Sequence, residues 1–463
     1  MNTTRKLTLV LVLALLLSPT RAWGHAHLKR SEPVAGSKTT SSPQWIRLWF
    51  TERPELSMTI VSIKDANGNV FALGSPEVDR SDPLLISVRV AQPLPAGRYT
   101  VAWRTAASDG HPSRGTFSFV VLANATVPGI GPVGQVGDAD TLRSENASAA
   151  SSTMFENEEE ADEASSITNS LARAFSFVGL LVLIGATVFR TLVLRGAREI
   201  DTAVRVRMEQ RAAALGLAAS IIVILSAIAR VFLMSEMMSA MPEMHAMSAT
   251  DMAMHTRWGF AVRLEIGAAL VALASFGLAV RRVRGAWFVA TIAAILLAAT
   301  PALAGHAAAS PKFTSLMIAT DFLHVLGGAS WLGNLLVVMV VGVPVSLTCD
   351  GAERWSSVAS LVNSFSPIAL ASAALVVASG VIASWVHLET LSALWQTAYG
   401  QVLLLKMFLV AIALTIGAYN FRRVQPQLAN EVGSTRLRRS AGIELSVGFL
   451  ILLVTGFLTG ISP

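Results

Sequence analysis

Cysteine is almost absent from this sequence, and charged residues are scarce. The chain of 463 residues contains one cysteine, Cys349, so no intramolecular disulfide can form, and an exported part must be stabilised by its core or by a ligand. Only 14% of the residues are charged, whereas 53% are hydrophobic. Because the apolar residues also come in runs of about 20, long enough to cross a bilayer, an ordinary soluble protein is excluded.

Two motifs with well-understood chemistry are also missing. The sequence has no G-x-x-x-x-G-K-[ST] motif, which argues against ATP hydrolysis as a driving force, and no Cys-x-x-Cys pair that could receive a metal. The formal net charge of +6 at pH 7 could suggest nucleic acid. The arginines, however, cluster between hydrophobic segments, where orientation in the bilayer explains them, so we expect neither nucleic-acid nor nucleotide binding.

The first 24 residues have the three parts of a secretory signal peptide. A basic start is followed by the apolar run LTLVLVLALLLS, and the small residues Ala22 and Gly24 stand at the positions that a signal peptidase reads. We expect residues 1–24 to be removed, which would make His25 the mature N-terminus. The alternative is an uncleaved signal anchor.

Residues 25–122 predict a small all-β domain. Alternating runs such as WIRLWF, LLISVRV and GTFSFVVL are separated by turn signals, including the hairpin pair Asn67-Gly68. The spacing favours a Greek-key sandwich or barrel ectodomain. Residues 123–166, which are rich in Gly, Ser and Ala and carry the acidic run ENEEEADE, predict a disordered acidic linker.

Residues 167–463 predict a polytopic α-helical membrane bundle of eight transmembrane helices. The apolar segments lie at about 170–194, 212–234, 258–280, 286–304, 313–342, 364–387, 400–421 and 440–461.

The charge of the connecting loops predicts the orientation of this bundle. The loops after the first, third, fifth and seventh segments are rich in arginine, whereas the opposite loops hold little more than Arg257 and Lys312. This asymmetry predicts a plasma-membrane protein whose β domain and C-terminus lie on the periplasmic or extracellular side. The arginines are Arg195, Arg198, Arg205, Arg207, Arg211, Arg281, Arg282, Arg284, Arg354, Arg422, Arg423, Arg436, Arg438 and Arg439.

The eight histidines share a location on this topology. Each lies in the exported domain, in an outer loop or in a membrane segment, and none lies in a cytoplasmic loop. This segregation indicates a soft or borderline metal that is handled from the outer face. The histidines are His25, His27, His111, His245, His255, His306, His324 and His387.

The outer loop at 234–256 concentrates eight of the chain's 15 methionines. Thioethers are soft, neutral donors that suit Cu(I), and imidazole suits copper in either oxidation state. The pattern favours copper capture, and the alternative is a flexible apolar contact surface. The residues concerned are Met234, Met237, Met238, Met241, Met244, His245, Met247, Met252, Met254 and His255.

Asp109 and His111 form a D-x-H pair in the β domain. Their spacing projects both side chains to the same face of an extended segment. Together with the α-amine and imidazole of His25 they would supply three nitrogens and one oxygen, a set that suits tetragonal Cu(II). The alternative is that both are ordinary turn residues before Pro112.

These stretches resemble a known family. The runs HAHLKRSEPVAGS, LWFTE and YTVAWRTAASDGHPSRGTFSF resemble the bacterial copper-resistance protein CopC, a periplasmic β-barrel that binds Cu(II) through its N-terminal histidine and a D-x-H pair. The resemblance implies that His25, Asp109 and His111 are the ligands, and His27 occupies a frequent family histidine position. Some members carry a separate methionine-rich Cu(I) site. Because this domain contains only Met58, we expect it to bind Cu(II) alone, with thioether chemistry in the membrane loop.

The membrane half resembles the partner family CopD. The resemblance rests on the runs AGHAAAS, DFLHVLGGASWLGNL, YGQVLLLKMFLVAIALTIGAYNFRRVQPQL and RRSAGIELSVGFLILLVTGFLTGISP. The whole chain is therefore similar to a CopC–CopD fusion, which implies copper transport in copper homeostasis or resistance.

Asp321 and His324 lie three residues apart, on one face of the fifth membrane segment. Ionisable groups at membrane depth usually face a bundle interior. With His306 and His387 at the outer ends of neighbouring segments, they predict a copper relay that starts at the methionine loop.

The alternative interpretation of Asp321 and His324 is structural. They would then hold the bundle together by pairing with Arg230, Arg263 or Lys406. For Glu265 and Glu444 we favour such pairing, because both lie beside basic residues in the pattern.

The sequence thus predicts a copper-binding membrane transporter, with import favoured. We expect no enzymatic activity. The alternatives are a copper sensor or store, for which the bundle is an anchor, and a histidine-brace copper monooxygenase. Asp109 argues against the latter, because an anionic ligand in the plane would fill the position that O₂ needs. A periplasmic copper chaperone or a reductase is a candidate partner.

Overall fold

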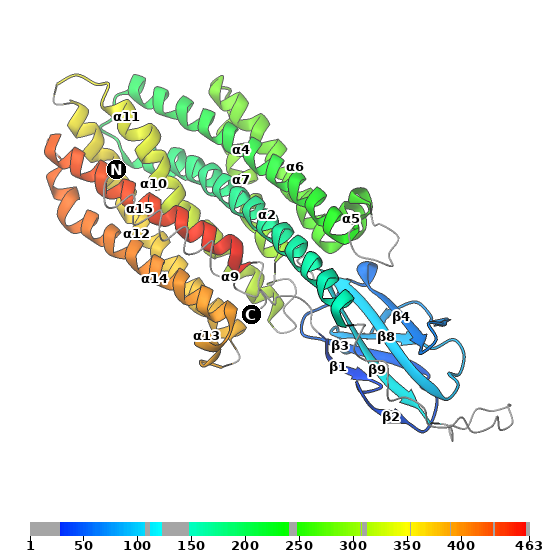
Figure 1. Cartoon of the computed structure of the whole chain (residues 1–463). Helices are drawn as coiled ribbons and strands as arrows, with labels where there is room; N and C mark the ends of the chain where they lie inside the picture. Colours follow the sequence, from blue (N-terminus) through cyan, green and yellow to red (C-terminus); the bar gives the residue numbers. More distant parts are fainter. Residues whose placement is uncertain are drawn as a thin grey trace.

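The structure is a computed structural model in which a β domain lies at one end of a long helical bundle (Figure 1). It describes residues 28–106, 112–122, 148–239, 248–305, 307, 313–351, 353–388, 390–428 and 431–459. The expected signal peptide, residues 1–24, lies outside the described residues.

Two sheets pack face to face in the β domain, because alternate residues of each strand point into a shared core. Ile46, Leu48 and Phe50 of one sheet are buried in this way, and the ring of Phe50 meets that of Trp103 of the other sheet edge-on, with a centroid distance of 5.2 Å. One sheet has the order β1 (Leu28–Glu32), β3 (Trp45–Phe50), β7 (Leu85–Arg89), β6 (Glu77–Val78). The other has the order β2 (Lys38–Thr39), β9 (Pro112–Val121), β8 (Gly97–Ala106), β4 (Ile60–Asp65), β5 (Val70–Phe71).

The predicted hairpin at Asn67-Gly68 is confirmed, since β4 and β5 pair antiparallel on either side of it. Gly68 has a φ of +86°, a left-handed conformation that glycine adopts without strain. The Asp65 carboxylate accepts hydrogen bonds from the backbone N–H groups of Asn67 and Asn69, both at 2.9 Å. The turn is thus held by its own side chains.

Within the described residues, eight helices are long and apolar enough to cross a membrane, so the predicted number of spans is confirmed. They are Ile167–Gly196, Thr202–Glu236, Arg257–Val280, Ala286–Ala304, Thr314–Ser346, Glu353–Val386, Ala398–Gln427 and Glu431–Leu458.

Five of these spans are single helices, and the other three continue through short π-helical or 3-10 segments. The first span is formed by α2 (Ser148–Val188), η2 (Phe189–Val193) and α3 (Leu194–Gly196), and the second by α4 (Thr202–Ser239). After the short α5 (Ala249–His255) come α6 (Arg257–Val280), α7 (Ala286–Ala304) and α9 (Thr314–Gly328), the last continuing through η3 (Ala329–Gly333), α10 (Asn334–Val337), η4 (Val338–Gly342) and α11 (Val343–Ser346). The bundle ends with α12 (Glu353–His387), α13 (Ala393–Gln396), α14 (Ala398–Tyr419), η5 (Asn420–Val424), η6 (Gln425–Gln427) and α15 (Glu431–Leu458).

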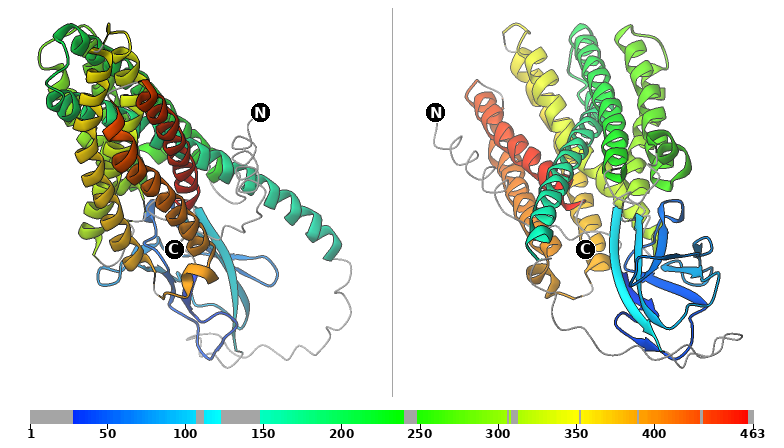
Figure 2. Two further views of the ribbon diagram at one scale, coloured as in Figure 1. Left: turned by 90° about the vertical axis from the view of Figure 1, so that its left-hand side faces the viewer. Right: turned by 45° about the vertical axis from the view of Figure 1, so that its right-hand side comes forward.

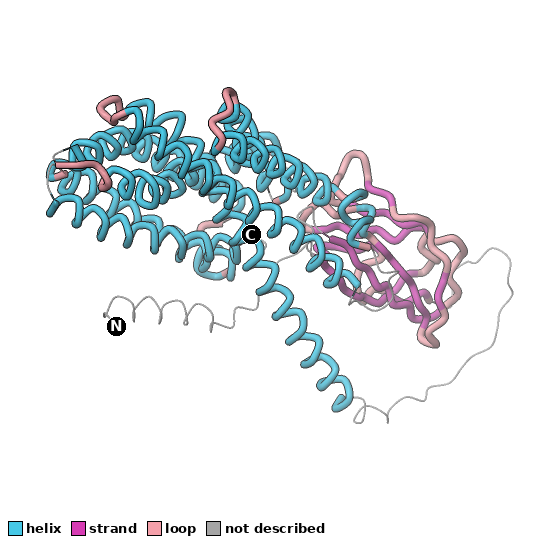
Figure 3. The backbone as a smooth tube through the Cα atoms, turned by 90° about the horizontal axis from the view of Figure 1, so that it is seen from above, coloured by secondary structure: helices cyan, strands magenta, loops and turns pink. Residues whose placement is uncertain are grey.

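The structure departs from the disordered linker expected at 123–166. Helix α2 begins at Ser148, so the acidic run belongs to a helical extension that projects beyond the neighbouring helices (Figure 3). Glutamate and alanine are strong helix formers, and extending an existing helix requires no new nucleation. Residues 123–147 lie outside the described residues.

The β domain and the C-terminal end of α15 lie at the same end of the bundle, next to α5 (Figure 2). Because successive spans alternate in direction, the connections after α3, α6, α11 and η6 lie at the opposite end, and these connections carry the arginine-rich stretches.

Backbones approach very closely where α2 crosses η3. A Cβ atom added to Gly333 would lie 1.9 Å from the carbonyl oxygen of Leu181, and one added to Gly185 would lie 2.3 Å from the carbonyl carbon of Gly333. Small residues allow such crossings in membrane bundles. This contact fixes the fifth span, which carries Asp321 and His324, against the first.

Replacing Gly333 with alanine is therefore expected to destabilise the protein by about 1–3 kcal/mol, because the new methyl group overlaps the backbone of α2. Thermal unfolding of the detergent-solubilised protein measures the effect. Gly328→Ala in the same span is the matched control, since a Cβ there meets nothing within 4 Å. Equal unfolding temperatures for the two variants would contradict the expectation.

Candidate metal sites and the cavity of the bundle

Most of the predicted ligands lie outside the described residues or have undescribed side chains. His25, His27, Asp109, His111, Met241, Met244, His245, Met247 and His306 are in the first group. Met237, Met238 and His387 lie in α4 and α12, but nothing is described of their side chains. Among the residues that are described, no three His, Cys, Asp or Glu side chains gather as a metal site would require.

The described residues that flank the two predicted Cu(II)-ligand segments lie near one another in the β domain. β8 and β9 pair as far as Ala106 and Pro112, so Asp109 and His111 belong to the connection between these paired residues. β1 begins at Leu28, directly after the N-terminal segment, and Leu28 pairs with Phe50. Phe50 in turn packs on the ring of Trp103, near the end of β8.

This same region of the β domain contacts the bundle. Met58 and Ala106 of the β domain share one buried cluster with Ala227, Met234, Met252, Trp258 and Val262 of the bundle. The backbone N–H of Arg257 donates a hydrogen bond to the Glu55 carboxylate at 3.3 Å. Burial of Arg53 lowers its pKa, the nearby Arg257 lowers it further, and Glu55 raises it. Ala106, the last described residue before the D-x-H connection, therefore lies beside the N-terminal end of α6.

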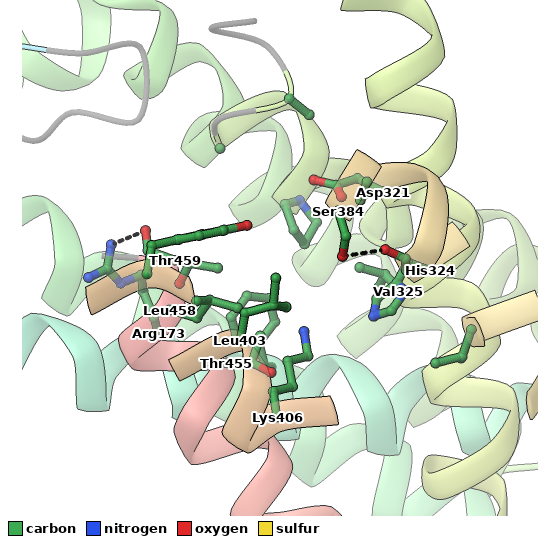
Figure 4. A pocket seen from close by; sticks show the side chains of 18 of the residues that line it. Arg173, Asp321, His324, Val325, Ser384, Leu403, Lys406, Thr455, Leu458 and Thr459 are labelled. Carbon is green, nitrogen blue, oxygen red and sulfur yellow. Dashed lines mark hydrogen bonds between the residues drawn. The ribbon is translucent and has the colours of Figure 1, made fainter. Parts of the chain in front are cut away.

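A cavity of about 960 Å³ lies in the bundle next to this contact. Met234 and Trp258, which belong to the interdomain cluster, also line the cavity. Its walls are mostly apolar, with a small set of ionisable side chains: Arg173, Arg230, Glu265, Asp321, His324, Tyr399 and Lys406. Figure 4 shows Asp321 and His324, both from α9, on one side of this space and Lys406, from α14, apart from them.

His324 is held by α12 rather than by a basic residue. Its Nδ1 atom lies 3.0 Å from the hydroxyl oxygen of Ser379. That hydroxyl donates its proton to the Leu375 carbonyl at 2.6 Å, so it can only accept from the imidazole. The proton of the neutral ring is thereby assigned to Nδ1, which leaves the Nε2 lone pair free for a metal ion.

In the structural interpretation, Asp321 and His324 pair with Arg230, Arg263 or Lys406. The described interactions support this for one of the three basic residues only. Asp321 and Lys406 attract each other electrostatically. Arg230 pairs instead with Glu265, and Arg263 donates from Nη1 to the sulfur of Met254 at 3.1 Å. Lys406 is thus the one basic residue of the three whose described interactions include Asp321.

Arg230 and Glu265 form a buried ion pair in the cavity wall, as favoured for Glu265 from the sequence. Ser176 of α2 donates to the same carboxylate at 2.7 Å. This network ties the first three spans together, and breaking a buried pair leaves an uncompensated charge.

Among the described residues, Glu444 forms no ion pair with a basic residue, contrary to the expectation. It accepts hydrogen bonds from Trp331 Nε1 at 3.0 Å and from Asn420 Nδ2 at 2.9 Å. These two neutral donors provide each oxygen of the buried carboxylate with a hydrogen bond.

The described part of the methionine loop is divided between two environments. Met252 is buried in the interdomain cluster, whereas Met254 and His255 are exposed. Ser248 caps the N-terminus of α5 by accepting from the backbone N–H of Asp251 at 3.1 Å. Part of the loop is thus packed against the β domain, and its described thioethers do not form one continuous exposed surface.

Sequence reasoning missed two features of this region. One is the arrangement of Met58 with Met234 and Met252, which no local pattern signals. The other is the role of Ser379 as partner of His324, since serine is common in these helices. Lys406 could be found, because it is a single cation inside the apolar run LLLKMFLV.

Comparison with known proteins gives three family matches in order along the chain. Residues 28–122 match the CopC domain, residues 164–314 match the copper resistance protein D-like N-terminal domain, and residues 359–458 match copper resistance protein D.

Relatives match both the whole chain and its N-terminal part. The copper transport protein CutJ of Bacillus subtilis is 24% identical over 459 residues, which cover 98% of this chain and 77% of that protein. Protein YobA of Escherichia coli is 35% identical over 107 residues, covering 23% of this chain and 85% of that protein. Copper resistance protein C of Xanthomonas campestris is 33% identical over 122 residues, which cover 25% of this chain and 93% of that protein. Among solved structures, CopC from Methylosinus trichosporium is 25% identical and covers 22% of this chain and 99% of that chain, with a TM-score of 0.21.

Proposed function

Because this chain belongs to the copper-resistance CopC–CopD family, with a CopC domain followed by CopD-like domains, we propose that it captures copper outside the plasma membrane and transports it inward. The protein is a multi-pass membrane protein that handles copper. The matched families are binding and transport families, so it is not an enzyme.

The β domain is proposed to capture Cu(II) through His25, Asp109 and His111. The flanking residues Leu28, Ala106 and Pro112 support this assignment, because they lie near one another in the β domain. Three nitrogens and a carboxylate suit Cu(II). His27 is a further candidate ligand, and the domain bounds 25–122 remain part of the proposal.

The cavity is proposed as the route through the membrane. One observation carries this proposal: a single cavity is lined at its β-domain side by Met234 and Trp258, and is also lined by Asp321 and His324. A free imidazole nitrogen and a carboxylate can act as transient ligands for a copper ion that crosses an otherwise apolar space. His306, His387 and the exposed His255 are candidate ligands on the approach to it.

The outward orientation of the β domain is supported by charge. The bundle end away from the β domain carries the arginine-rich connections, which the positive-inside rule places in the cytoplasm. Copper bound by the β domain would then come from the periplasmic or extracellular side, where a copper chaperone or a reductase is a candidate partner.

Cellular copper content tests the proposed direction of transport. Cells that lack this protein are expected to contain less copper than the parent strain, and cells that overproduce it are expected to contain more, because an importer adds to the total. Mass spectrometry of washed cells measures the content. Higher copper in the deletion strain would contradict import and indicate export. Unchanged copper in both strains would favour a sensor or store.

A further inference from the structure

Three buried methionines from three separate elements belong to one apolar cluster where the β domain contacts the bundle. Met58 ends η1 (Leu56–Met58) of the β domain, Met234 lies on α4, and Met252 lies on α5. Their exposed fractions are 2%, 2% and 1%, and all three belong to one cluster of seven buried residues. The β domain's one methionine is thus packed into the same cluster as two methionines of the outer loop region.

Packing alone does not explain this concentration of methionine. Three of the seven buried cluster members are methionines, whereas the described residues outside the cluster bury only two more, Met208 in the large core of the bundle and Met317 on α9. Leucine fills such space with less loss of side-chain entropy. The enrichment is therefore local to the contact between the domains.

The backbone is held in place by hydrogen bonds at two of the three methionines. The backbone N–H of Met58 donates to the Glu55 carbonyl at 3.0 Å, and Glu55 N–H donates to the Ala106 carbonyl at 2.8 Å. On the other side, the Thr256 hydroxyl donates to the Met252 carbonyl at 2.7 Å. A Cβ on Gly259 would lie 2.3 Å from that same carbonyl oxygen, so α5 is seated tightly on α6. These contacts fix the backbone positions from which the Met58 and Met252 side chains extend, and a metal site needs ligands on such rigid supports.

The chemistry of the cluster matches one class of ion. Thioethers are neutral and soft, and they suit Cu(I). A monovalent cation needs less compensation than a divalent one in a dry site, and the ring of Trp258 in the cluster can add a cation–π attraction. Met254 is different, because its sulfur already accepts a hydrogen bond from Arg263.

We propose that Met58, Met234 and Met252 form a Cu(I)-binding site shared between the β domain and the bundle. Met234 lines the cavity that contains His324, so Cu(I) bound here stands between the outer surface and the transport route. The site takes copper that is already monovalent. This inference rests on the proposed function for its place in transport, but not for its ability to bind Cu(I).

Replacing Met58 with leucine tests the shared site in the full-length, detergent-solubilised protein. Leucine keeps the apolar volume but removes the sulfur, so Cu(I) affinity is expected to fall by at least about tenfold. Competition with a chromophoric Cu(I) chelator at one equivalent measures it, and X-ray absorption counts the sulfur neighbours. Ag(I), which does not change oxidation state, is the second probe. Met252→Leu should give the same loss from the bundle side.

Met208→Leu is the matched control, since Met208 is equally buried on α4 but outside the cluster. It should leave both affinity and sulfur count unchanged. Thermal unfolding confirms that the variants fold, and if Met58→Leu does not, Met252→Leu carries the comparison. Wild-type affinity and sulfur count in a folded Met58→Leu or Met252→Leu variant would overturn the shared site.

The failure of this site can be separated from failure of the proposed function. Copper accumulation in cells and the Cu(II) signal of the β domain are measured on the same variants. Normal accumulation with unchanged Cu(I) affinity in Met58→Leu rejects only the shared site. Absence of accumulation with the unmodified chain rejects the transport proposal, whatever the Cu(I) affinity.

Discussion

Cu(II) affinity of the mature protein is expected to fall by at least about 100-fold when His111 is replaced with alanine, because the site loses one of its two imidazoles. Inserting one residue between Gly24 and His25 should have the same effect. The insertion leaves every side chain in place but separates the α-amine from the imidazole of His25, so the two can no longer chelate the ion together.

Electron paramagnetic resonance of the bound Cu(II) and competition with a chelator measure this loss. Mass spectrometry of the N-terminus establishes that cleavage follows Gly24 in the parent protein. Arg98→Ala is the control, because Arg98 is an exposed residue at the start of β8, at the end of that strand opposite to Ala106. Parent-like Cu(II) binding by both altered chains would rule out the proposed ligand set.

Asp109→Asn separates the roles of charge and shape in the same site. The amide has nearly the same volume as the carboxylate but no negative charge, so weaker Cu(II) binding would assign the fourth ligand to Asp109. Asp79→Asn is the matched control, since Asp79 is an aspartate of the same domain whose side chain bonds to Ser81.

Copper accumulation is expected to be lost almost completely in the His324→Ala variant, while the Cu(II) signal of the β domain stays unchanged. Alanine removes the Nε2 lone pair that the contact with Ser379 leaves available in the cavity. The other wall residues of the cavity are mostly apolar, so no neighbouring imidazole among the described residues that line it can replace the lost one.

Ser379→Ala gives a graded version of this test. It retains the imidazole but removes the acceptor that assigns the proton to Nδ1, so accumulation should fall by about 10-fold rather than vanish. Ser384→Ala is the matched control on the same helix. Its hydroxyl also lines the cavity (Figure 4) but donates to the Gly380 carbonyl at 2.8 Å. If all three variants accumulate copper equally at equal membrane abundance, His324 is not part of the route.

The division of the chain into a β domain and eight spans could be predicted from local pattern. The alternation in WIRLWF buries Ile46, Leu48 and Phe50 as expected, and Asn67-Gly68 turns the chain between paired strands. Span length is imposed by the thickness of the bilayer and strand alternation by backbone geometry. Both are properties of short segments, and a sequence displays them directly.

The acidic run before the first span shows where local composition misleads. Charge and low hydropathy favoured disorder, but the same glutamates and alanines are good helix formers once a helix exists beside them. The structure extends α2 back to Ser148. Whether such a segment is helical depends on what it is attached to, which composition does not contain.

The chemical groups of the chain can be read directly from its sequence: a D-x-H pair, eight histidines, a methionine-rich loop, and two ionisable residues one helical turn apart in the fifth span. The partners of these groups in hydrogen bonds, ion pairs and packing contacts are apparent only in the tertiary structure. In the folded protein His324 contacts Ser379, and Glu265 forms an ion pair with Arg230. Met58 of the β domain packs in the same cluster as Met234 and Met252. The reason is geometric. Each residue along a helix turns the side chain by about 100°, so the neighbour on another helix depends on how the helices cross, which close backbone contacts such as that at Gly333 determine.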